Sequence, residues 1–198
     1  MRNRLRKIEL KSGRWCYHSP YFIFIRNINE DTIFNLLEQE GITVSEKFDS
    51  SDPTRYEYEF FIVYWNDWAI IMDNWWHSLS QYNEKNLIFD KFGKDYEVFE
   101  CMVGDVDHSF SFKYQKNGKV IRHLDVSNLS YSKGDLKIEI DEGHPLKGEA
   151  KFLKVDGEYE KVINILYEQG IEFPEDIKNG NCYKYRIGQD EGRTLSRR

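Results

Sequence analysis

The sequence predicts an α+β fold, in which a largely antiparallel, strongly twisted sheet carries about three helices. Residues 56–76 hold four of the five tryptophans, and the centre of this segment is apolar at consecutive positions. Such runs are typical of strands that are buried on both faces. The dipeptides Asn66-Asp67 and Asn117-Gly118 each separate two strand-like runs, as hairpin turns do. Two amphipathic segments that end at a glycine supply helices between the strands.

The first elements follow from alternation and capping signals. Residues 20–26 are predicted to form a strand, and a helix follows them. Asn29 is placed as the N-cap of this helix, acidic residues occupy its first turn, and Gly41 ends it. Residues 42–48 carry apolar side chains at alternate positions and predict the next strand.

The aromatic hairpin has a defined register if its turn consists of two residues. One face then pairs Trp65 with Trp68, Val63 with Ile70, and Phe61 with Met72. The other face pairs Tyr64 with Ala69, Ile62 with Ile71, and Tyr58 with Trp75. Because both faces are apolar, we expect this hairpin to lie in the middle of a sheet that is covered on both sides.

The remaining elements are predicted from the same signals. They are a helix from Ser78 or Ser80 to about Phe92 and closed by Gly93; strands at 96–103, 110–114, 120–126, 136–140, 151–155 and 182–187; and a helix from about Glu158 to Gln169, capped by Asp156 and stopped by Gly170. Residues 32–42 and 161–171 share Asn, Leu, Gly and Ile at equivalent positions. This likeness indicates either an old duplication, with two helices that pack similarly on one sheet, or two helices that obey the same capping rules.

Length and composition bound the class of protein. A chain of 198 residues suffices for one domain with a buried core. We expect a basic arm at 1–14, a compact domain at 15–187 and a mobile tail at 188–198. No apolar run approaches the ~20 residues that span a bilayer. The chain has three cysteines, Cys16, Cys101 and Cys182, and they lack metal-ligand spacing. This favours reduced thiols and a cytoplasmic location.

The charge is unevenly distributed along the chain. The net charge of −6 comprises +5 in residues 1–14, +1 in residues 188–198 and −12 in residues 15–187. A field of this sign repels nucleic-acid phosphates and attracts basic partners. Ordinary solubility is the other interpretation, because net charge bears on association and not on fold.

One cluster of ionisable residues has the composition of a cation site. Asp105, Asp107 and His108 are predicted to follow the end of a strand, where two carboxylates and an imidazole would hold a divalent ion. The spacing matches the opening of a calcium loop, but the later glycine and glutamate of that loop are missing. The alternative is a polar loop whose side chains accept hydrogen bonds from backbone amides. For the protein as a whole, no cofactor is expected.

The Asn117-Gly118 hairpin suggests a catalytic pair. With a two-residue turn, the register sets Tyr114 opposite Ile121, Phe112 opposite His123, Phe110 opposite Asp125 and Lys113 opposite Arg122. His123 and Asp125 then share the aromatic face, where the carboxylate would orient the imidazole as a general base, with His108 as a further candidate. Alternatively, the two groups satisfy each other near a sheet edge. A bulge would shift this register and break up the pair.

The end of the aromatic hairpin supplies candidate binding residues. Asp73 is the polar residue of this hairpin, and it is predicted either to reach solvent or to cap the segment that begins at Trp75. Trp75 and Trp76 are adjacent, so on a strand they point to opposite faces and one of them would be free to anchor a partner, beside His77. The alternative is that both indoles belong to the core.

Residues 104–122 resemble a hairpin of small cytoplasmic bacterial proteins, among them the immunity proteins of contact-dependent and polymorphic toxin systems. Aromatic alternation, Asn117-Gly118 and the basic Arg122 four residues after Gly118 carry the resemblance. It implies a soluble, acidic binder without catalysis. We therefore expect a binding protein that inhibits a basic toxin domain and contacts neither nucleic acid nor membrane. The alternatives are a metal- or His/Asp-dependent enzyme and a small-ligand module with its pocket between sheet and helices.

Overall fold

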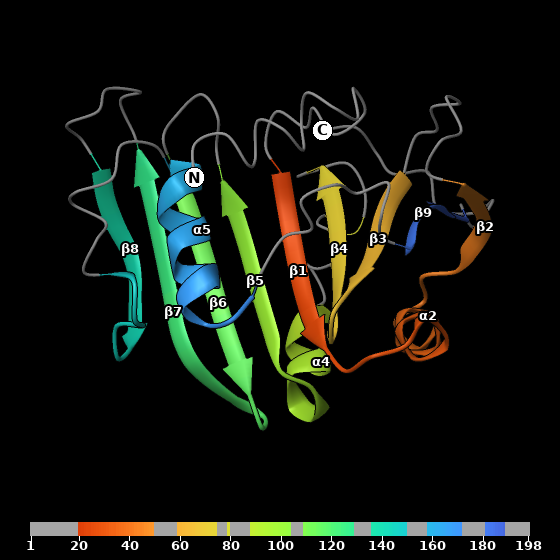
Figure 1. Ribbon diagram of the computed structural model, residues 1–198, viewed down its shortest axis with the longest axis horizontal. Helices are drawn as coiled ribbons and strands as arrows, with labels where there is room; N and C mark the ends of the chain where they lie inside the picture. The colour runs from red at the N-terminus through yellow and green to blue at the C-terminus, as the bar shows by residue number, and fades with distance from the viewer. Residues whose placement is uncertain are drawn as a thin grey trace.

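The structure is a computed structural model that describes residues 20–49, 59–74, 79, 88–103, 109–128, 136–149, 158–171 and 181–188. In this part of the chain, three helices pack on one sheet of nine strands, and every pairing is antiparallel (Figure 1). The α+β prediction with a largely antiparallel sheet is confirmed. The elements are β1 (Pro20–Arg26), α2 (Glu30–Gln39), β2 (Val44–Asp49), β3 (Glu59–Trp65), β4 (Trp68–Asn74), α4 (Ile88–Asp95), β5 (Val98–Val103), β6 (Phe110–Lys116), β7 (Lys119–Asn128), β8 (Leu136–Gly143), α5 (Glu158–Glu168) and β9 (Asn181–Ile187).

The strand order is β2-β9-β3-β4-β1-β5-β6-β7-β8. The first strand of the chain therefore lies at the centre, between β4 and β5, and the last strand inserts between β2 and β3. Among the described strands, β2 and β8 are the two edges of the sheet. β8 follows β7 and pairs with it, so the β8 end of the sheet is a simple antiparallel meander from β5 to β8.

The aromatic hairpin has the predicted register. Trp65 lies opposite Trp68 and Phe61 opposite Met72, and the intervening pairs also agree with the prediction. Asn66 occupies the turn with a φ of 54°, which a tight hairpin turn requires. The predicted pair of Tyr58 and Trp75 lies outside the described residues.

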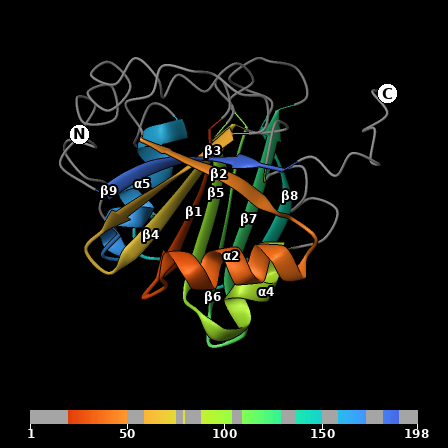
Figure 2. The same cartoon turned by 90° about the vertical axis from the view of Figure 1, so that its right-hand side faces the viewer.

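The sheet separates two cores. Successive side chains along β3 and β4 point to opposite faces of the sheet, so Val63 belongs to one core and the adjacent Ile62 to the other. Figure 2 shows α5 on one side of the sheet and α4 on the other, and α2 packs on the α4 side. We call the side of the sheet that α5 covers the α5 face, and the side that α4 and α2 cover the α4 face. The two-sided burial that the aromatic run predicted is present.

Helices α2 and α5 end in the same way but pack on opposite faces. The amide of Ile42 donates to the carbonyl of Leu37, and the amide of Ile171 donates to that of Leu166, each at 2.9 Å. The glycine before each of these isoleucines has a φ of 76°. At the other end of α2, Asn29 accepts from the amide of Thr32 at 2.8 Å, as its N-cap role predicts. Similar packing of the two helices, the expectation under a duplication, is not observed.

The predicted end of α4 is wrong. Gly93 does not stop the helix, which continues to Asp95. A Cβ atom at Gly93 would lie 2.3 Å from Oε1 of Gln115, so this glycine permits close packing of α4 on β6. The predicted start at Ser78 or Ser80 lies outside the described residues, as do the strand at 151–155 and the cap Asp156. Among the helices described, none is long and apolar enough to cross a membrane.

Candidate functional site

The second hairpin, β6–β7, departs from the predicted register by one residue. A bulge between Tyr114 and Gln115 places Lys113 opposite His123, and Phe112 opposite Leu124. All four predicted pairings of this hairpin are therefore wrong: Tyr114 with Ile121, Phe112 with His123, Phe110 with Asp125 and Lys113 with Arg122. A shift of one residue exchanges the faces of a strand, and the observed register is the one that buries Leu124 and Val126.

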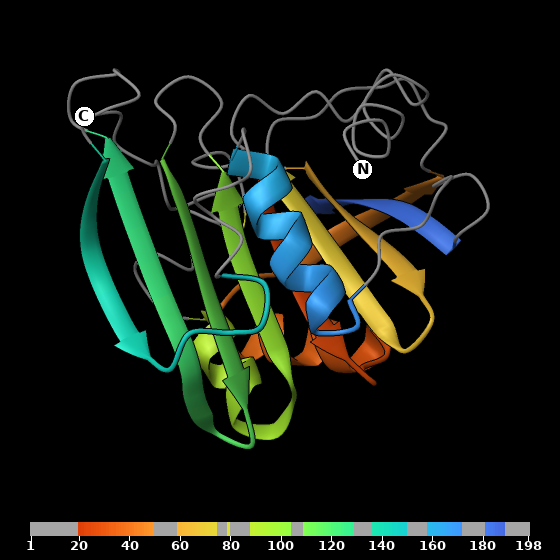
Figure 3. The same ribbon diagram turned by 60° about the vertical axis from the view of Figure 1, so that its left-hand side comes forward.

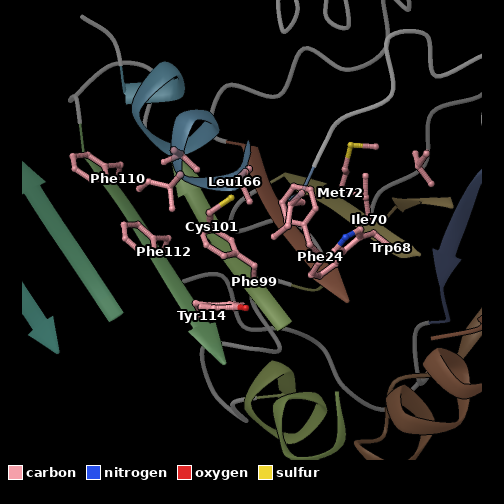
Figure 4. Close-up of a cluster of buried hydrophobic side chains, with 14 of the residues drawn as sticks. Phe24, Trp68, Ile70, Met72, Phe99, Cys101, Phe110, Phe112, Tyr114 and Leu166 are labelled. Carbon is pink, nitrogen blue, oxygen red and sulfur yellow. The ribbon is translucent and has the colours of Figure 1, made fainter. Parts of the chain in front are cut away.

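The apolar side of this hairpin belongs to the α5 face. Phe110 and Phe112 point to this face together with Phe99 and Cys101 of β5, under Leu166 of α5 (Figure 4). The rings of Phe99 and Phe112 stack with centroids 5.6 Å apart and an angle of 6° between their planes. His123 and Asp125 consequently lie on the opposite face, away from these aromatic rings.

On the α4 face, charged side chains form a row across four strands. Glu100 of β5 lies opposite Lys113 of β6, Lys113 opposite His123 of β7, and His123 opposite Glu142 of β8. We call these four residues the polar row. Neighbouring side chains on one face of a sheet interact directly, and here no two like charges are adjacent. Asp125 lies on the same face, two residues along β7 from His123.

Part of the polar row is used to anchor α4. Nζ of Lys113 lies 2.5 Å from Oδ1 of Asp90, and Nε2 of Gln115 donates to the same oxygen at 2.6 Å. The amide of Gly118 in the hairpin turn donates to the carbonyl of Gly93 at 3.0 Å. The bulged end of the hairpin is thus fastened to the helix beside it. At the other end of the row, the hydroxyl of Tyr21 donates to Glu100.

The environment shifts the pKa values of His123 and Asp125 in opposite directions. Burial, aided by Lys113, lowers the pKa of His123 below its usual 6.5, although Glu142, Asp125 and Asp90 act against this. Burial raises the pKa of Asp125 above its usual 3.8, and His123 opposes this shift. At neutral pH the imidazole is therefore uncharged. Although the two groups remain neighbours, no hydrogen bond joins them in the described part of the chain.

Arg122 is the residue that the predicted register misplaced most. Instead of lying opposite Lys113, it points to the α5 face with its side chain 3% exposed. Its Nη2 atom lies 2.9 Å from Oε2 of Glu149, and its Nη1 atom lies 2.5 Å from Oδ1 of Asp141. Oε1 of Glu149 also accepts from the amide of Leu146 at 2.5 Å. The signal that would have revealed this was the like-charge pair itself, because directly opposed cations argue against a register.

The outer strand β8 is the most exposed strand of this region. Its residues Leu136–Gly143, which we call the β8 edge, lie at the end of the sheet, as Figure 3 shows. Leu136 is 40% and Ile138 58% exposed, and no other large apolar side chain among the described residues exceeds the exposure of Ile138. Three acidic side chains follow Ile138 along this edge and are also exposed: Glu139, Asp141 and Glu142.

The acids of the β8 edge differ in how far the fold uses them. Asp141 is bound to Arg122, and Glu139 accepts from Ser127 and from Lys137, each at 2.8 Å. The carboxylate of Glu142 forms no hydrogen bond or ion pair within the described residues. Both Glu142 and Glu139 lie at the solvent-exposed margin of the polar row, but only Glu142 keeps its charge unpaired by any described residue, because Glu139 is bound to Lys137.

The other predicted site residues are distributed as follows. Asp73 is described; its side chain is 0% exposed, opposite Tyr21 of β1, so it does not reach solvent. Outside the described residues lie Trp75, Trp76, His77, Asp105, Asp107 and His108. Within the described residues, no three His, Cys, Asp or Glu side chains are placed to hold a metal ion. Cys101 and Cys182 are buried free thiols, and burial raises the pKa of Cys101.

Comparison with known proteins gives no match for this chain, whether among family models, curated proteins or solved structures.

Proposed function

We propose that this chain is a non-catalytic cytoplasmic protein that binds a basic protein domain. In the more specific form that the resemblance of residues 104–122 implies, it is an immunity protein and the partner is a toxin domain. The observation that carries the proposal is the β8 edge, where Leu136 and Ile138 are exposed beside acidic side chains. We further propose that the sheet is strongly twisted, as the sequence predicts.

The charge of the chain supports a cationic partner. The net charge is −6, and residues 15–187 account for −12 before the basic ends offset part of it. An acidic surface accelerates encounter with a basic protein and disfavours acidic competitors. Glu142 adds a specific point of attraction, because no cation of the described residues neutralises it.

The apolar side chains of the same edge supply the contact area that charge does not. Single exposed hydrophobic residues are normal on protein surfaces and need no explanation. Here, the four most exposed large apolar residues described lie on β7 and β8: Leu136 and Ile138 at the β8 edge, and Val120 and Ile121 beside the β6–β7 turn, at the other end of the paired strands. Apolar side chains within an acidic rim are typical of protein interfaces, in which the centre is dry and the margin charged.

The test is affinity capture from a lysate of the native host, with the retained protein identified. The chain is immobilised and washed at about 50 mM and about 500 mM salt, because screening weakens exposed charge pairs over this range. We expect a basic protein to be retained at low salt and released at high salt. The double variant Glu139→Gln/Glu142→Gln should retain less of it.

A matched variant distinguishes this edge from net charge alone. Glu38→Gln/Glu46→Gln makes the same change of two charges at exposed positions of α2 and β2, and it should retain the partner as the wild type does. Failure to retain any protein at low salt would contradict the proposal. A divalent ion that raises the melting temperature of the wild type but not of Asp107→Ala would then favour the metal-dependent enzyme, and a metabolite that does so would favour the ligand module.

A further inference from the structure

The β8 edge has a side that no described strand uses. β8 pairs with β7 along one side, and no described strand pairs with its other side. Along that side, every second residue presents backbone N–H and C=O groups that the sheet does not satisfy, which makes the strand a template for another one. β8 is eight residues long, a sufficient length for such pairing.

The opposite edge of the sheet, β2, differs from β8 in the exposure of its apolar side chains, although polar contacts tie both strands to their neighbours. Nζ of Lys47 lies 2.9 Å from Glu30 of α2 and 3.8 Å from the ring centroid of Tyr183, so its side chain ties β2 to its neighbours. Oγ of Ser45 donates to the carbonyl of Arg186 at 3.2 Å. No large apolar side chain of β2 is exposed, whereas Leu136 and Ile138 of β8 are.

The two faces of β8 differ in chemistry. Ile138 lies opposite Val126, which belongs to the core of the α5 face, and Leu136 lies on the same face two residues away. On the α4 face, Glu142 lies opposite His123 and Lys137 lies opposite Ser127, while Glu139 accepts from both Ser127 and Lys137. Asp141, opposite Leu124, shares the α5 face but is bound to Arg122. A strand added to this edge would therefore meet the apolar Leu136 and Ile138 on one face and a mostly acidic set of side chains on the other.

We propose that β8 accepts an additional strand in trans, supplied by an extended segment of the basic partner in which basic and apolar residues alternate. The inference rests on the proposed function and specifies how the partner is held. Apolar residues of the segment extend the α5-face core beside Leu136 and Ile138. Its basic residues lie on the α4 face, next to Glu139 and Glu142. The backbone groups of the free edge supply the hydrogen bonds, as in other cases of strand addition.

The probe is a capped peptide of alternating Lys and Val, equal in length to β8. Its binding to the full chain is measured by titration, and its location by hydrogen exchange of the β8 amides. Two isomers of the peptide carry methyl groups on the backbone nitrogen of every second residue. One isomer is methylated at all the lysines and the other at all the valines. Because alternate N–H groups of a strand point to the same edge, we expect one isomer to lose binding and the other to retain it. A peptide with all its lysines before its valines should bind weakly.

Variants of the chain complete the test. Ile138→Lys places a cation at an exposed position of the docking strand, and we expect affinity for the alternating peptide to fall about tenfold. Ser45→Lys adds the same charge at the β2 edge and should leave the affinity within about twofold. Thermal melting of both variants verifies that the fold is retained.

Several results would overturn the inference. Equal binding of the two methylated isomers, protection at β2 in place of β8, or equal affinity of the two lysine variants would each exclude strand addition at β8. Dimerisation of the chain alone, abolished by Ile138→Lys, would assign the edge to a second copy. Salt-sensitive capture of a basic partner that depends on Glu139 and Glu142 would leave the proposed function standing in any of these cases.

Discussion

The two hairpins β3–β4 and β6–β7 begin from nearly the same turn and end in different registers. Each has an asparagine with a φ of 54° in its turn, Asn66 in the first and Asn117 in the second. The first hairpin pairs in its simple two-residue register. The pairing of the second shifts at a bulge between Tyr114 and Gln115, close to the turn. The turn residue alone therefore does not determine which side chains face which core.

Burial accounts for the difference. Ile62 and Val63 are adjacent on β3 and both are buried, so both faces of the first hairpin are apolar. On β7, by contrast, the shift of one residue decides whether Leu124 or His123 enters the core. The second hairpin adopts the shift that buries the apolar residue, and the bulge absorbs the extra residue. Arg122 is carried into the interior by the same shift.

The largest expected effect comes from removing the carboxylate that accompanies Arg122. Glu149→Ala leaves a buried guanidinium without its main partner and should lower the free energy of unfolding by about 3–5 kcal/mol, measured by urea titration. Asp141→Ala removes the exposed partner of the same arginine and should cost below about 1 kcal/mol. Equal costs for the two variants would contradict an interior position of Arg122.

The double variant Arg122→Met/Glu149→Leu sharpens the same point. A buried ion pair replaced by apolar side chains of similar size is often neutral, so most of the loss seen in Glu149→Ala should be recovered.

A second prediction compares neighbouring residues on the two hairpins. Ile62→Ala should cost about 2–5 kcal/mol, because it opens a cavity in a fully buried site, and Val63→Ala should also be costly. On β6, Phe112→Ala should cost about 3–5 kcal/mol, whereas the adjacent Lys113→Ala, on the polar face, should cost about 1 kcal/mol. A large loss for Lys113→Ala would show that the second hairpin is as intolerant on both faces as the first.

A third prediction concerns the backbone that holds β8 against the second hairpin. Gly143 has a φ of 81°, and a Cβ atom there would lie 2.1 Å from the carbonyl oxygen of Ile121. Gly143→Ala should therefore cost about 3 kcal/mol, at the upper end for backbone strain. Gly118 has a similar φ of 70°, but the atom nearest to a Cβ there would be 3.5 Å away. Gly118→Ala should therefore lower the free energy of unfolding by about 1 kcal/mol in the same urea titration.

The smallest effect is a pH dependence. Since burial lowers the folded-state pKa of His123 below 6.5, the unfolded chain binds the proton more tightly. The stability is fully present above pH 6.5 and is lost as the pH falls through that value toward the folded-state pKa. His123→Gln should lose less stability than the wild type between about pH 7.5 and about pH 5.5. Asp125 acts in the opposite sense, because its raised pKa gives stability that is lost as the pH rises.

The sequence allowed prediction of those features that depend on near neighbours. The N-cap at Asn29, the end of α2 at Gly41 and the pairing of Trp65 with Trp68 all follow from residues a few positions apart, and the structure confirms them. The same reasoning failed where a distant contact decided the outcome. Gly93 resembles a helix stop, but Gln115 of β6 packs against it and the helix continues.

The candidate site was predictable only in part. His123 and Asp125 were identified as neighbours, but their face depended on a bulge that no local signal specifies. The opposition of Lys113 to Arg122 was the available warning against the simple register. Residues 136–140 of the β8 edge were predicted as a strand, although the position of β8 at the end of the sheet and its exposure follow from the order of all nine described strands. The burial of Asp73 likewise follows from β1, a strand far from it in the sequence.

The position of β9 has a consequence for biosynthesis. β9 pairs with both β2 and β3, which leave the ribosome more than a hundred residues earlier. Until residues 181–187 have been translated, the nascent chain holds β3 with one side unpaired and the ring of Phe60 without its stacked neighbour Tyr185. The sheet therefore closes only after residue 187 has been synthesised, and until then the open side of β3 is a site at which aggregation is favoured.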